Sequence, residues 1–154
     1  IGIGKRSRIG YLINLARLYI DLTNLAIILR VVIFKRSLSV LRDSLIDGGF
    51  IGLDLLKVRP EDELKDVVEN LRLLFRRAFI GIESWMDGLE VMERFEKNFR
   101  STILEYSRFA DYLTFGVEPL ISLYLKKQEE LRILRAIYLG KKNNFTKEDI
   151  KEML

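Results

Sequence analysis

The sequence predicts an all-α protein, a bundle of long helices, on three observations. Only 2 prolines occur in 154 residues, so few positions must interrupt a helix. Strict alternation of apolar and polar residues, the pattern of a half-buried strand, is rare along the chain. Apolar residues instead recur at spacings of three and four, as they do on one face of a helix. We expect more than about two-thirds of the chain to be helical, in a single domain over residues 1–154 with an internal break near residues 47–60.

The first predicted helix runs from about Ser7 to Lys35 and is apolar over most of its circumference. A helix apolar almost all round lies either in a protein interior or in lipid. Charged and amide side chains interrupt the apolar run, which favours a buried central helix over a transmembrane span. Two apolar seams consist of Tyr11, Leu15, Leu18, Leu22, Leu25, Leu29 and Val32, and of Ile13, Ile20, Ile27 and Phe34; the polar stripe is Asn14, Arg17, Asp21 and Asn24.

Two further helices are predicted in the middle of the chain. A short segment, residues 37–46, stops at Asp47-Gly48-Gly49, where two glycines permit a left-handed turn. Pro60 and the acids after it favour a helix start, and that helix should continue to about Arg76. Gly81 then separates it from a long helix from Glu83 to about Arg108. Its predicted core stripe is Trp85, Leu89, Met92, Phe99, Ile103 and Tyr106, which Glu96 interrupts.

The last part of the chain predicts a long helix and a short one. Residues 111–116 read as a turn, and Pro119 stands where a first-turn proline belongs. This helix should run to Leu139 and end at Gly140. Thr146 and Asp149 then resemble a capping box in front of a short terminal helix.

Composition excludes most catalytic chemistry. With no His and no Cys, there is no Ser-His or Cys-His nucleophile, no zinc site of the usual ligands and no disulfide. A carboxylate-only site stays open, and metal bound at Asp21 or Glu96 would favour it. Gly2-Ile3-Gly4 lacks the preceding strand and the Gly-Lys-Ser/Thr ending of a phosphate-binding loop. We therefore expect no cofactor and no ATPase activity of the chain itself.

The charge balance of +4, with a pI near 9.3, is compatible with an acidic partner or a lipid headgroup surface. Cations are interleaved with acids on almost every predicted helix, a pattern that argues against nucleic-acid binding. The cluster Lys5, Arg6 and Arg8 is either a solvated end or a contact for an anionic partner. On the third long helix, the set Lys126, Lys127, Glu130 and Arg132 is interpreted as a solvated or partner-binding surface.

Polar residues inside apolar stripes are predicted to set the register of the helices. Arg17 lies one turn before Asp21 on the same helix face, so the two should pair, with Asn24 beside them. Glu96 needs a partner from another helix, and Gln128 or Arg135 is expected to supply it. The alternative is a ligand or proton site at the same carboxylates.

Three stretches resemble a rotor-subunit family, known as C in archaeal A-type ATP synthases and as d in eukaryotic V-type ATPases. The segment IDLTNLAIILR, residues 20–30, is similar to the D-x-x-N-x-x-x-x-x-R helix of that family. Asp47-Gly48-Gly49 matches the glycine turn that follows it. The closing stretch from Gly116 resembles the end of the family, with a Gly-x-x-Pro start, a helix bearing Lys127, Glu130 and Arg135, a Gly-Lys stop and a final short helix. Residues 51–92 are covered by position alone.

The resemblance implies a non-catalytic adaptor of the central rotor, peripheral to the cytoplasmic face of the membrane. It would couple the central stalk of the soluble motor to the membrane ring of proteolipid subunits during proton or sodium transport. Chains of this family are about twice as long, so we expect this sequence to be the C-terminal half of a funnel-shaped, pseudo-threefold helical subunit, in keeping with its start at Ile1. The alternative is an unrelated helical module that binds a partner helix or an anionic membrane surface.

Overall fold

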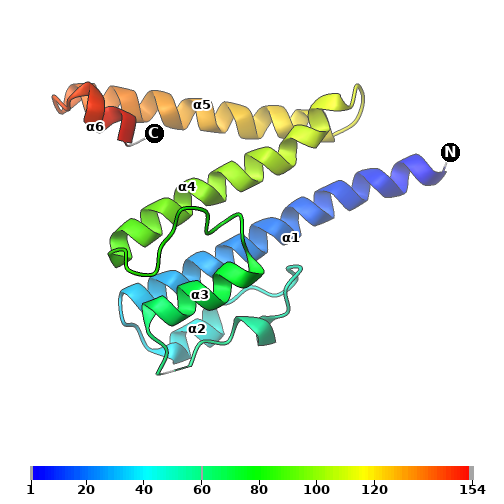
Figure 1. Ribbon diagram of the computed structural model, residues 1–154. Coiled ribbons are helices and arrows are strands. Elements are labelled where there is room, and N and C mark those ends of the chain that lie inside the picture. Colours follow the sequence, from blue (N-terminus) through cyan, green and yellow to red (C-terminus); the bar gives the residue numbers. More distant parts are fainter. Residues whose placement is uncertain (1, 60, 153–154) are drawn as a thin grey trace. The chain divides into compact units, whose positions relative to one another are not determined.

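The computed structural model describes the backbone of residues 2–59 and 61–152, and their side chains apart from those of residues 2–9, 42 and 152 (Figure 1). It is 71% helical, which confirms the all-α prediction, and its described residues contain no strand. Pro60, predicted to start a helix, lies outside the described residues, as do the side chains of Lys5, Arg6 and Arg8. The elements are α1 (Gly2–Ile33), α2 (Leu38–Ser44), the 3-10 helix η1 (Leu53–Leu56), α3 (Leu64–Leu74), α4 (Gly88–Ser107), the 3-10 helix η2 (Arg108–Tyr112), α5 (Glu118–Lys142) and α6 (Lys147–Glu152).

The chain divides into two compact units, residues 1–106 and 107–154. The first unit holds α1 to α3 and nearly all of α4, and the second holds η2, α5 and α6. The break expected near residues 47–60 falls inside the first unit, in the non-helical chain around η1. That the two units form a single domain stays a prediction.

The core of the first unit is built around α1, which contacts α2 and α3 (Figure 1). Three side-chain pairs also join α1 to α4: Tyr11 stacks on Tyr106, Tyr19 meets the edge of Phe99, and Arg30 binds Glu96. The α4 partner moves backward as the α1 residue moves forward, so the two helices are antiparallel. The fully buried side chains of this unit include Leu22, Leu25, Ile28, Leu29, Leu56, Val68, Phe79, Ile82, Val91 and Phe95.

Two predicted boundaries in the first unit are wrong. Helix α3 begins at Leu64, after Glu63, because residues 59–62 form a turn in which the Asp62 carboxylate accepts the Arg59 N–H. Helix α4 begins at Gly88, where the Asp87 carboxylate accepts the Leu89 N–H. The predicted core residues Trp85 and Leu89 are therefore exposed, and the buried stripe runs instead through Val91, Phe95 and Ile103.

In the second unit α5 continues through Gly140 to Lys142, two residues beyond the predicted stop. A Cβ atom at Gly140 would lie 2.5 Å from Ile150 Cγ1, so the glycine serves the close approach of α6 rather than the end of α5. The predicted capping box is confirmed. The Asp149 carboxylate accepts the N–H and hydroxyl of Thr146, and the Asp149 N–H donates to the Thr146 hydroxyl.

By length and composition alone, one helix of the described residues could cross a membrane: Gly10–Ile33, within α1. The core helix of a folded unit passes the same test. Asp21 and Asn24 are buried on this helix, and α2 and α3 pack on it. These contacts favour the buried central helix that the sequence predicts.

Candidate functional site: a polar clamp on α1

Asp21 and Asn24 form a buried polar clamp on one face of α1. They are 1% and 0% exposed, and their spacing of three places both side chains on the same side of the helix. The Asp21 carboxylate accepts the backbone N–H groups of Phe50, at 3.0 Å, and Ile51, at 3.3 Å. The Asn24 side chain pairs with both backbone groups of Ile46, donating to its carbonyl and accepting its N–H, each at 2.8 Å. The clamp therefore holds the backbone of residues 46–51, which we call the clamped turn.

The glycines of the clamped turn fit the clamp. A Cβ atom at Gly49 would lie 1.9 Å from Asp21 Oδ1, so any side chain there would displace the carboxylate. Gly48 has φ +99°, a conformation that side chains with a Cβ atom disfavour. The first glycine allows the backbone to turn, and the second allows the turn to reach the buried acid.

The outer side of the clamped turn is apolar and half exposed. Ile46 is 44% and Phe50 is 53% exposed. The Arg17 guanidinium carbon lies 5.9 Å from the centre of the Phe50 ring, within the range of a cation–π contact. Arg17 thus contacts the clamped turn from outside.

Both predicted carboxylate pairings need correction. Asp21 uses its oxygens on backbone N–H groups of the clamped turn, and among the described residues no ion pair joins it to Arg17. Glu96 binds Arg30 of α1 at 2.9 Å, in a half-exposed pair with side chains 45% and 52% exposed. The expected partners behave differently: Gln128 donates to the Tyr124 hydroxyl on its own helix, and Arg135 is exposed.

A second clamp, on α4, was not predicted from the sequence. The Asn98 side-chain amide donates to the carbonyls of Ala78, at 3.0 Å, and Ile80, at 2.8 Å. It holds the segment before Gly81, which has φ +68°. The available signal was the parallel with α1, since each clamp is an asparagine on a long helix that bonds the backbone of a glycine-containing turn.

The predicted partner-binding residues of α5 are placed in three ion pairs. Lys126 binds Asp111 and lowers the pKa of that carboxyl by its hydrogen bond, with a further hydrogen bond from Ser122. Arg132 pairs with Glu129, and that hydrogen bond raises the pKa of the guanidinium. Lys127 pairs with Glu130 at 2.6 Å, with side chains 60% and 58% exposed. Of the four predicted residues, Lys127 and Glu130 are the most exposed, and their role in partner binding stays a prediction.

The arrangement is suited to holding chain segments rather than to chemistry. Both Asp21 oxygens are occupied by N–H donors, and Glu96 is neutralised by Arg30. Among the described residues no group of three or more His, Cys, Asp or Glu side chains is placed to hold a metal ion. The carboxylates that sequence left open for a site therefore have structural partners.

Comparison with known proteins places the chain in a family. The family model described as the ATP synthase (C/AC39) subunit matches residues 4–153, nearly the whole sequence. No curated protein and no solved structure matches the chain. The match spans α1 with its clamp, the clamped turn, and both helices of the second unit.

Proposed function

The chain belongs to the ATP synthase (C/AC39) subunit family, and from this membership we propose that it is a non-catalytic adaptor of the central rotor. The adaptor joins the central stalk of the soluble motor to the membrane ring of proteolipid subunits and passes torque between them. The observation that carries the proposal is the family match over residues 4–153. A helical module unrelated to rotary ATPases is excluded by the same match.

The contacts within the first unit support a mechanical role. A part that passes torque must resist shear between its helices and bending of its turns. Three side-chain pairs brace α1 against α4, and two of them are aromatic pairs with ring centres 5.5 and 5.3 Å apart. The clamp adds four hydrogen bonds to the 46–51 backbone. Helix α4 and the clamped turn are thereby tied to α1 by specific contacts.

The adaptor is proposed to be peripheral, on the cytoplasmic face of the membrane. Rotary ATP synthases are membrane-associated, and this chain is one of their subunits. Helix α1 is apolar enough to span a bilayer, yet its buried face carries Asp21 and Asn24 bonded to the clamped turn. Lipid around α1 would separate it from that turn and leave a carboxylate unpaired in hydrocarbon, at a cost of several kcal/mol.

The test is reconstitution of the complete rotary complex in vesicles, with and without this protein. Omission should leave ATP hydrolysis by the soluble motor and abolish ATP-driven ion uptake, because torque no longer reaches the ring. Chemical cross-linking of the intact complex should join the chain to a protein of the stalk and to a protein of the ring. Ion uptake that persists without the chain, or cross-links to neither partner, would refute the proposal. ATP turnover by the purified chain, with no motor protein present, would refute its non-catalytic part.

A further inference from the structure

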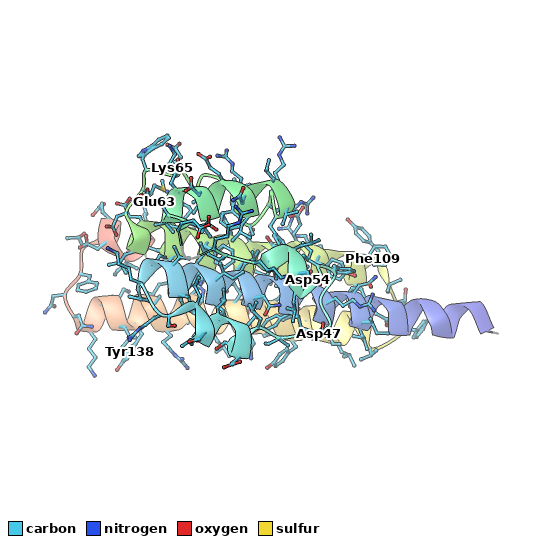
Figure 2. All side chains as sticks on the ribbon, turned by 90° about the horizontal axis from the view of Figure 1, so that it is seen from below. Asp47, Asp54, Glu63, Lys65, Phe109 and Tyr138 are labelled. Atoms are coloured by element: carbon cyan, nitrogen blue, oxygen red, sulfur yellow. The ribbon has the colours of Figure 1, made fainter. Side chains whose placement is uncertain are left out.

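Helix α5 has two opposite faces with different surroundings. Glu118, Ser122 and Gly140 lie on one face and are buried. The opposite face is apolar and exposed, and Tyr138, labelled in Figure 2, marks its C-terminal end. We call this face the α5 seam; it consists of Leu120, Tyr124, Leu131, Leu134 and Tyr138, which are 66%, 60%, 63%, 61% and 63% exposed.

The spacing of the α5 seam is that of a helix made to pack along another helix. Its members follow steps of four and three, with Lys127 in the one remaining position of the repeat. At a rise of 1.5 Å per residue the seam is about 27 Å long. Isolated exposed leucines are ordinary on protein surfaces, but a continuous apolar stripe of this length marks an interaction surface.

The charges beside the α5 seam are mostly positive. Lys127 stands inside it, Arg135 and Lys142 flank it seven residues apart, and Lys141 ends it. No carboxylate of the described residues forms an ion pair with the last three. Glu130 is the acid next to Lys127 on α5, and the two already pair with each other. A complementary surface must therefore bring carboxylates.

We propose that the α5 seam binds an amphipathic helix of another polypeptide, with an apolar stripe and carboxylates that meet Lys127 and Arg135. A second copy of this chain fits less well. Two parallel seams would bring Lys127 against Lys127 of the other copy, and two antiparallel seams would bury Lys127 against Leu131. A buried ammonium without a carboxylate is costly, so the lysine selects an acidic partner. This surface belongs to the second unit and uses no residue of the clamp, so the proposal stands whether or not the chain is a rotor adaptor.

Two synthetic helical peptides with the same leucine stripe test the proposal, one with glutamates and the other with lysines beside the stripe. Binding of each to the full chain is measured by fluorescence anisotropy. The glutamate peptide should bind at least about tenfold more tightly, equivalent to about 1.4 kcal/mol. Leu131→Ser should weaken that binding by a similar factor, whereas Leu73→Ser, at an 85% exposed position on α3, should not. The double variant Lys127→Glu, Arg135→Glu should reverse the preference between the peptides.

Because the chain has no cysteine, Leu134→Cys supplies a unique reporter for the state of the seam. The thiol should react readily with a maleimide in the free chain and be protected by the glutamate peptide. Circular dichroism of each variant checks that the helices are retained. Equal binding of the two peptides, binding of neither, or a thiol already protected in the free chain would overturn the proposal. A dimer in sedimentation equilibrium that Leu131→Ser dissolves would show that a second copy is the occupant instead.

Discussion

Substitution of Gly49 by alanine gives the sharpest test of the clamp on α1. The φ angle of Gly49 lies outside the left-handed region, so alanine meets no backbone strain there. The added methyl group would, however, lie 1.9 Å from Asp21 Oδ1 and 2.9 Å from Asp21 Cγ. Real contacts of a Cβ atom are essentially never shorter than 3.0 Å, so either the carboxylate or the turn must move.

The expected loss follows from the bonds that this movement breaks. The carboxylate must retreat by about 1 Å, which takes its bonds to the Phe50 and Ile51 N–H groups, now 3.0 and 3.3 Å long, beyond hydrogen-bond range. Hydrogen bonds to a charged group contribute about 1.5–3 kcal/mol each. Gly49→Ala should therefore lower the free energy of unfolding by about 3–5 kcal/mol. Asp21→Ala should lower it by a similar amount.

The decisive measurement is the double variant, followed by urea unfolding with circular dichroism and by amide exchange in residues 46–51. In the Asp21→Ala background, Gly49→Ala should cost little more, since the methyl group enters space that the carboxylate has left. Gly52→Ala is the matched control: no atom lies within 4 Å of its Cβ position, and it should be neutral or slightly stabilising. Additive losses, or a Gly49→Ala loss no larger than that of Gly52→Ala, would show that Asp21 does not hold the turn.

Three further predictions concern other contacts. Because the Arg30–Glu96 pair is half exposed, an Arg30→Met and Glu96→Leu double-mutant cycle should give a coupling of at most about 1 kcal/mol that shrinks with added salt; a coupling that salt does not change would contradict this. Lys126→Met should raise the lowered pKa of Asp111 towards its ordinary 3.8, measured by carboxyl NMR titration. Because the folded pKa lies below the unfolded one, this pair stabilises above pH 3.8 and is lost as pH falls through the folded pKa, so the two proteins should converge in stability in acid. Gly140→Ala should displace α6 and cost about 1–3 kcal/mol, seen as faster amide exchange in that helix; unchanged exchange would refute the close packing.

The sequence by itself determined the helical class and the features that depend on neighbours within one turn. Apolar spacing located the long helices because a helix repeats every 3.6 residues wherever it lies. The Thr146–Asp149 box was predictable because its donors and acceptors are three residues apart. The unusual burial of Asp21 also followed from its place in an apolar helix.

Only the tertiary structure decided what the polar residues bind. Asp21 bonds backbone groups 29 and 30 residues away, and Arg30 meets Glu96 across 66 residues. The helix pattern placed Arg17 one turn from Asp21, but it could not show that the clamped turn folds back with two N–H groups aimed at the carboxylate. Nor could it show that α4 begins at Gly88, which leaves Trp85 and Leu89 exposed. Such partners depend on where the intervening chain returns, and that is set by the packing of the whole unit rather than by any local run of residues.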